Sequence, residues 1–113
     1  MKYILNIGLN NTNYSKVMEQ INNSKGYLFD DYNVREVTGT YNNNIEPTLV
    51  VSFYSFSSLD SIKFKIKDWC KTLKQDCIAL TIKGMLEKNV GILIYNESYK
   101  GEKQAFNNKY FIQ

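Results

Sequence analysis

Three short stretches, far apart in the chain, carry polar side chains that suit the binding of a small molecule. They are Asn10-Asn11-Thr12, Glu46 with Thr48, and Gln75-Asp76. Amide side chains both donate and accept hydrogen bonds, so the asparagines and the glutamine suit the polar edges of a nucleobase or a ribose, and the carboxylates can accept from hydroxyl groups. The alternative is that these side chains cap helices and satisfy turn backbone, as Asn and Asp commonly do.

Two of these residues, Glu46 and Asp76, also suit acid–base catalysis as a pair of carboxylates. The sequence contains no histidine, which excludes Ser-His and Cys-His nucleophile systems and removes the commonest metal ligand. Nothing else in the sequence supports a reaction, so we expect a non-enzymatic protein without a metal or a cofactor. Arg35, the only arginine, suits phosphate binding or is an exposed strand position.

The composition is that of one small globular domain. The chain has 113 residues, of which 43% are hydrophobic and 22% charged, and its net charge is +3. That charge is too small for a dedicated duplex-DNA binder and fits either solubility or a small anionic ligand. We interpret Cys70 and Cys77 as buried, reduced thiols. Without a signal peptide or a membrane span, the sequence predicts a cytoplasmic protein.

Hydrophobic periodicity predicts the elements that position these residues. Alternation over 2–9 predicts a first strand, and residues 32–41 read as an exposed or edge strand with a possible bulge at Gly39. A third strand is expected over 48–56, directly after Pro47. Two further strands, over 77–82 and 90–95, pair most simply as a hairpin.

Two amphipathic helices are expected between these strands. The first runs from Tyr14 to about Ser24. The second begins after Ser57-Ser58, which cap it, and has the strongest apolar stripe in the chain. That stripe comprises Leu59, Ile62, Ile66, Trp69 and Leu73, with Cys70 beside it. We expect it to lie in the core.

This order of elements predicts an α+β ferredoxin-like sandwich, with two helices on one face of an antiparallel sheet. The expected strand order is fourth, first, third and second, extended by the fifth. The end of the first strand and the starts of the third and fourth then meet at one edge, together with the N-terminus of the first helix, a simple anion site. We therefore expect the three polar stretches to converge there and to bind a small anionic or nucleotide-like ligand.

The other face of the sheet has no helix in this arrangement. Bare aromatic residues there would be costly exposed area. We expect cover either from the aromatic C-terminal segment, residues 96–113 of the single domain 1–113, or from a second copy. A symmetric dimer is the simplest form of the second solution.

Three motifs resemble a small protein family found on phages and mobile elements. They are Glu46-Pro47-Thr48-Leu49-Val50-Val51, Gln75-Asp76-Cys77-Ile78-Ala79, and Phe106-Asn107 with Tyr110-Phe111. The closing motif here lacks the tryptophan and proline that are often seen in that family. The resemblance implies a setting of phage counter-defence, in which small oligomeric proteins sequester nucleotide signals or inhibit a defence protein.

Three functional hypotheses follow. The first is a phage-type counter-defence protein that sequesters a small nucleotide-derived signal without catalysis. The second is an inhibitor or adaptor that binds a host defence protein through an exposed sheet edge or the lysine-rich face of the second helix. The third, which the missing RNP-type aromatic motif disfavours, is a nucleic-acid-binding module.

Overall fold

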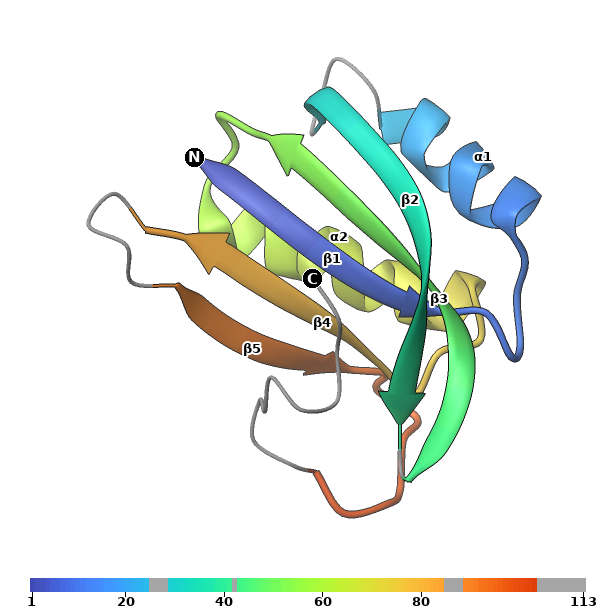
Figure 1. Cartoon of the computed structure of the whole chain (residues 1–113). Helices are drawn as coiled ribbons and strands as arrows, with labels where there is room; N and C mark the ends of the chain where they lie inside the picture. Colours follow the sequence, from blue (N-terminus) through green and yellow to red (C-terminus); the bar gives the residue numbers. More distant parts are fainter. Residues whose placement is uncertain (25–28, 42, 85–88, 104–113) are drawn as a thin grey trace.

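The first strand lies at the centre of the sheet, because its side chains are buried on both faces. In the computed structural model, which describes residues 1–24, 29–41, 43–84 and 89–103, five antiparallel strands are ordered β2-β3-β1-β4-β5 (Figure 1). The elements are β1 (Lys2–Gly8), α1 (Tyr14–Ser24), β2 (Asp30–Tyr41), β3 (Asn44–Tyr54), α2 (Leu59–Thr72), β4 (Cys77–Lys83) and β5 (Val90–Tyr95). The predicted strand order and the α+β ferredoxin-like sandwich are confirmed.

Both helices pack on one face of this sheet. Tyr3, Leu5 and Ile7 alternate along β1 and enter a single core cluster with Val17 and Ile21 of α1. The apolar stripe of α2 joins the same cluster, through residues that are fully or almost fully buried: Ile62, Ile66, Trp69, Cys70 and Leu73. The apolar side chains, which repeat every two residues in the strand and about every 3.6 residues in the helices, therefore meet on one side of the sheet.

Aromatic rings form the middle of the core. Trp69 stacks on Phe29 with ring centroids 5.2 Å apart, and Phe29 meets Phe53 edge-on at 4.2 Å. Phe53 in turn stacks on Tyr3 at 5.4 Å. Such pairs stabilise by about 0.5–1.5 kcal/mol beyond the area that they bury. This chain of rings joins α2 to the two central strands β3 and β1.

The second helix begins where the sequence predicts. Ser58 is its N-cap, and the Ser58 Oγ accepts a hydrogen bond from the backbone N–H of Ser61 at 3.2 Å. Asp60 adds a negative charge in the first turn, where the helix dipole favours one. The first helix is capped by Asn13, whose Oδ1 accepts from the N–H of Lys16 at 2.9 Å.

The start of β3 differs from the prediction. β3 begins at Asn44, so Pro47 lies inside the strand, opposite Thr38 of β2. A proline is tolerated there because β1 ends at Gly8, opposite Thr48, so no ladder bond from the Pro47 nitrogen is needed on that side. The Pro47 carbonyl accepts the N–H of Leu9 at 2.8 Å.

The irregularity in β2 also lies elsewhere than predicted. The pairing of β2 with β3 shifts between Asp30 and Asn33, whereas Gly39 pairs regularly with Glu46. Gly39 instead gives room to the side chain of Thr48, which a Cβ at that position would strike. Gly39 is therefore required by packing against Thr48 and does not mark a bulge.

The face away from the helices has buried positions as well. Ile4, Val50 and Ala79 alternate with the core residues of their strands and are at most 6% exposed. The described part of the C-terminal segment ends at Lys103, and Tyr99 within it stacks on Tyr95. Residues 104–113 lie outside the described residues, so the cover of this face and the dimer stay predictions.

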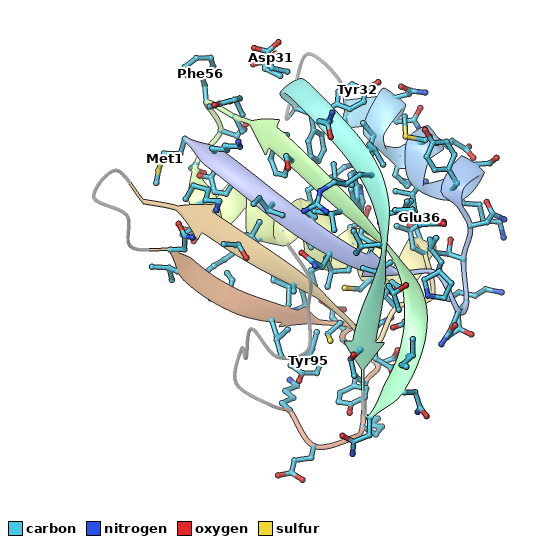
Figure 2. All side chains as sticks on the ribbon, in the orientation of Figure 1. Met1, Asp31, Tyr32, Glu36, Phe56 and Tyr95 are labelled. Atoms are coloured by element: carbon cyan, nitrogen blue, oxygen red, sulfur yellow. The ribbon has the colours of Figure 1, made fainter. Side chains whose placement is uncertain are left out.

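The two ends of the sheet differ in character. Met1 and Phe56 lie at the end where β1 begins, and Tyr95 lies near the other end (Figure 2).

Cys70 and Cys77 are both buried and form no disulfide, as predicted. Among the described residues, no helix is long and apolar enough to cross a membrane.

The core predicts a sharp contrast between two aromatic residues of α2. Replacing fully buried Trp69 by alanine should lower the free energy of unfolding by about 3–5 kcal/mol, because it leaves a large cavity. Phe64→Ala, at a position 77% exposed on the same helix, should change it by no more than about 0.5 kcal/mol. Urea denaturation followed by circular dichroism measures both, and equal losses would contradict the assignment of the core face.

Candidate functional site

The polar stretches converge where β1 ends. The β1 register places Gly8 opposite Thr48 of β3 and Asn6 opposite Ala79 of β4, so the start of both neighbours lies beside the loop after β1. A small cavity of about 80 Å³ opens at this edge. It is lined by Asn6, Gly8, Asn10, Asn11, Glu46, Lys74, Gln75 and Cys77. We call this cavity the edge pocket.

Glu46 is the one carboxylate among the described residues that line the edge pocket. Its Oε2 accepts the backbone N–H of Asn10 at 3.4 Å. The carboxyl group lies flat against Gly8: a Cβ there would sit only 2.6 Å from its carboxyl carbon. Only glycine at this position leaves that space free, so the backbone of β1 and of the following loop together position the Glu46 side chain.

Burial raises the pKa of Glu46, because the charged form loses hydration. The hydrogen bond from the Asn10 N–H acts in the opposite direction, and the nearby negative charge of Asp76 adds to the increase. The carboxyl of Glu46 is thus a stronger proton acceptor, once ionised, than an ordinary surface glutamate. Perturbed carboxyl groups in clefts are common at functional sites.

Gln75 forms the wall of the pocket that faces α2. The residue is buried, and its Nε2 donates to the carbonyl of Leu73 at 3.0 Å. The Gln75 backbone is held on both sides, since its N–H donates to the Cys70 carbonyl at 2.8 Å and its carbonyl accepts from Asn96 Nδ2 at 3.2 Å. This wall is therefore rigidly attached to the end of α2 and to the end of β5.

Four of the seven predicted residues line the edge pocket: Asn10, Asn11, Glu46 and Gln75. The other three do not. Thr48 is buried and donates from Oγ1 to the carbonyl of Glu46 at 3.3 Å, Asp76 is exposed beside the pocket, and Thr12 lies in the loop before α1. Arg35 is exposed on β2 and does not line the pocket. No residue of α1 lines it either, so the helix N-terminus is not part of this cavity.

Four residues that line the edge pocket were not predicted as site residues: Asn6, Gly8, Lys74 and Cys77. Lys74 follows the C-cap Leu73 with a backbone φ of 53°. Glycine or asparagine usually occupies such a left-handed position, and another residue there costs about 1 kcal/mol or more. Asn6 is 1% exposed in the middle of an otherwise apolar strand. Its position as a polar residue inside the otherwise apolar run of β1 was the feature of the sequence that could have identified it.

Cys77 also lines the edge pocket, and Cys70 lies behind it. The Cys70 Sγ donates to the carbonyl of Ile94 at 3.3 Å. Burial, followed by the neighbouring Cys77, raises the pKa of Cys70 to about 12. Because the thiolate is the reactive form, Cys70 has no role as a nucleophile near neutral pH.

Comparison with known proteins adds one structural match. No protein-family model and no curated sequence matches this chain. Among solved structures, a phage SAM lyase in its apo state is similar, with a TM-score of 0.65 and 16% sequence identity over 88% of this chain and 91% of the lyase chain. The two proteins thus share a fold over nearly their whole length. The phage family suggested by the sequence motifs stays a prediction.

This match corrects the expectation that the protein is not an enzyme. The fold is one that an enzyme uses, and that enzyme is a lyase. The expectation rested on the missing histidine, which excludes only nucleophile systems that need an imidazole. A carboxylate, amides and a lysine line the edge pocket, and such groups can bind and orient a substrate that carries its own reactive bond.

The pKa of Glu46 predicts how the stability of a Glu46→Gln variant depends on pH. The folded carboxyl has a higher pKa than the unfolded one, so the folded state binds more protons between the two values, and wild-type stability falls as pH rises through that window. The amide of the variant cannot ionise. The melting temperature of the variant should therefore rise relative to wild type on going from about pH 4 to about pH 7.

Thermal unfolding at both pH values tests this expectation. Glu19→Gln, at an exposed position of α1, removes the same charge away from the pocket and is the matched control. The prediction would be wrong if the melting temperature of Glu46→Gln, relative to wild type, were higher at the acidic pH than at the neutral pH. That result would show that the surroundings stabilise the ionised form of the buried carboxyl.

Cys70 should resist alkylation in the folded protein. Its pKa of about 12 leaves a negligible thiolate fraction at about pH 8, and its side chain is fully buried. Iodoacetamide treatment followed by peptide mass spectrometry should leave Cys70 unmodified without denaturant and label it fully in denaturant. Rapid labelling of the native protein would contradict this burial.

Proposed function

We propose that the protein is a lyase that cleaves a small, nucleotide-derived cation of the S-adenosylmethionine type, with the charged end of the substrate in the edge pocket. The near-complete overlap of its fold with that of a phage SAM lyase carries this proposal. The convergence of Glu46, Lys74 and amide side chains at one edge of the sheet supports it. The proposal keeps the expected nucleotide-derived target and replaces sequestration by cleavage.

The size of the edge pocket limits what enters it. Sites that enclose a whole drug-sized ligand usually measure about 300–1,000 Å³, whereas this cavity measures about 80 Å³. It therefore admits only the small charged end of the substrate, and the nucleoside part lies against the surface outside. The exposed side chain of Asn11, at the rim, is placed to meet that part.

The charges of the pocket suit a substrate that carries both signs. Glu46 offers a carboxylate, and Lys74 offers an ammonium group from a different chain segment. This pairing differs from the simple anion site expected from the sequence, because a lone anion would be repelled by Glu46. A sulfonium or ammonium group of the substrate would bind Glu46, and a carboxylate of the substrate would bind Lys74.

A lyase needs little more from the protein than this binding. The carbon–sulfur bond of such a sulfonium breaks without water when the substrate's own carboxylate attacks the carbon. A carbon–oxygen bond forms and closes a lactone, while the sulfur keeps the electron pair of the broken bond and becomes a neutral thioether. The leaving group is activated within the substrate itself, so orientation is the main contribution of the enzyme. We assign this orientation to Glu46, which the loop after β1 holds in place.

Removal of such a molecule by a small protein fits the phage counter-defence setting that the sequence motifs imply. A catalyst removes many molecules of a signal or cofactor, whereas a binder removes only one per site. This biological role rests on the resemblance of the motifs and on the lyase fold together.

The test is to incubate the purified protein with S-adenosylmethionine and to follow substrate loss and formation of a nucleoside thioether by liquid chromatography and mass spectrometry. Glu46→Gln should lower kcat/KM about tenfold to a hundredfold, the range expected for losing a charge-assisted hydrogen bond. Glu19→Gln is again the control. Wild-type activity should fall as pH falls through the raised pKa of Glu46, since protonation removes the charge that binds the cation.

Absence of any turnover of S-adenosylmethionine would overturn the lyase assignment. Turnover that Glu46→Gln leaves unchanged would keep the activity and remove the edge pocket from it. S-adenosylhomocysteine, whose sulfur is neutral, should remain intact in the same assay, because its carbon–sulfur bond has no activated leaving group.

A further inference from the structure

A second concave surface lies on the far side of α2, between that helix and β5. Its main cavity measures about 760 Å³ and is lined on one side by α2 and on the other by Ile92 to Glu97. Phe64 lines it with 77% of its surface exposed, and two adjoining cavities of about 140 and 430 Å³ also include Phe64. We call this surface the α2–β5 groove. An exposed aromatic ring in a groove is a typical anchor for a partner.

The strand that borders the groove lies at the edge of the sheet formed by the described residues. β5 (VGILIY) has no charged residue and no proline, and no strand of the described residues pairs with its outer side. The opposite edge strand, β2, carries Arg35 and Glu36 and an irregular register between Asp30 and Asn33. Charges and irregularities of that kind prevent a further strand from adding to an edge. Only β5 lacks them.

The orientation of the β5 backbone follows from one hydrogen bond. The N–H of Asn96 donates to the carbonyl of Asp76 at 2.8 Å, so Asn96 faces β4. In an antiparallel pair the facing residues alternate. The backbone groups of Gly91 and Leu93 therefore face the outer side, where an added strand would bond to them.

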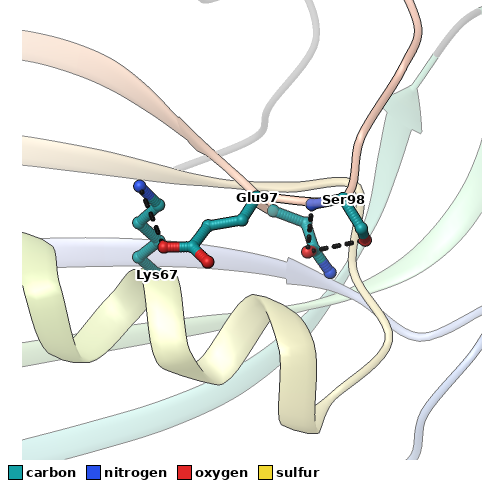
Figure 3. A network of polar contacts seen from close by, with 4 residues as sticks. Lys67, Glu97 and Ser98 are labelled. Atoms are coloured by element: carbon teal, nitrogen blue, oxygen red, sulfur yellow. Dashed lines mark hydrogen bonds and ion pairs between the residues drawn. The ribbon is translucent and has the colours of Figure 1, made fainter.

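The groove also has an excess of positive charge. Its lining residues include five lysines and three carboxylates: Lys63, Lys65, Lys67, Lys71 and Lys103, with Asp60, Asp68 and Glu97. One ion pair joins Lys67 to Glu97 at 3.4 Å, with both side chains well exposed (Figure 3). An exposed pair of this kind is worth about 1 kcal/mol at most, so a partner's carboxylate can replace Glu97.

We propose that the α2–β5 groove is a docking surface for an extended, acidic segment of another protein, which adds a strand to β5 and places an apolar side chain against Phe64. Strand addition supplies the affinity and the lysines select acidic side chains. A second copy of this chain fits less well, because pairing two β5 edges about a two-fold axis would bring two lysine-rich helices toward each other. The proposal does not depend on the lyase activity.

The test uses a short blocked peptide in which Glu alternates with Val and Phe, and a counterpart with Lys in place of Glu. In ¹⁵N–¹H spectra of the full chain, the acidic peptide should shift the amide signals of Gly91 and Leu93 saturably, and the basic peptide should not. An acidic peptide with alternate backbone amides methylated keeps its charge and cannot extend the ladder. It should leave those signals unshifted.

Two protein variants separate charge from fold. Lys63→Glu, in the groove, should weaken binding of the acidic peptide about threefold to fivefold, the effect of one exposed charge pair. Lys16→Glu makes the same change at an exposed position of α1 and should change binding less than about twofold, a small residual effect of net charge. Unfolding curves of both variants verify that they are folded.

Several outcomes would overturn the proposal. Equal binding of the acidic and basic peptides would remove the charge argument, and undiminished binding of the methylated peptide would remove strand addition. A second copy would be the occupant if sedimentation shows self-association and the Gly91 and Leu93 amides are protected in the associated form. In that case Lys63→Glu would weaken the association no more than Lys16→Glu does.

Discussion

Hydrogen bonding of β1 on both sides is the constraint on which the rest of the structure depends. Lys2 to Gly8 pair with β3, and Lys2 to Asn6 pair with β4, while alternate side chains of the strand enter the core. A shift of one residue in either register would turn Leu5 and Ile7 away from the helices. The register is therefore fixed by burial, and it determines which chain segments meet beyond Gly8. The edge pocket is a consequence of that alignment.

The fold was largely predictable because its periods are strong and its topology follows from simple rules. The alternation in β1 and the apolar stripe of α2 indicated their elements, and the strand directions predicted that Glu46 and Gln75 would meet. The start of β3 was not predictable in the same way. Pro47 reads as a strand boundary, and only the early end of β1 beside it explains why the strand runs through.

The candidate site was predicted in part, for a physical reason. Turn residues with amide and carboxylate groups could be assigned to one edge from topology alone, but whether a side chain points into a cavity depends on local packing. Thr48 turns toward Gly39 instead, and Lys74 reaches the pocket because its backbone takes a left-handed conformation after α2. The expectation of a non-enzymatic protein was wrong because a missing histidine excludes only chemistry that needs an imidazole, and this fold is shared with a lyase.

The edge pocket and the α2–β5 groove lie on either side of the same short segment. Asn96 joins them: its Nδ2 donates to the carbonyls of Cys70 and of Gln75, each at 3.2 Å. The end of β5, the last turn of α2 and the start of β4 are thus held as one unit. The proposed recognition of a small molecule and the proposed docking of a protein segment would use different faces of that unit.

The central position of β1 also sets the order in which the chain can fold. Lys2 has Tyr54 on one side and Lys83 on the other, so β1, which precedes the other four strands of this sheet in the chain, has both edges bonded only after the whole segment up to β4 has been made. Contacts of such long range close slowly, because loop entropy must be lost before they form. Until then the apolar strand β1 is exposed, and the nascent chain is at its most vulnerable to aggregation and to chaperone capture.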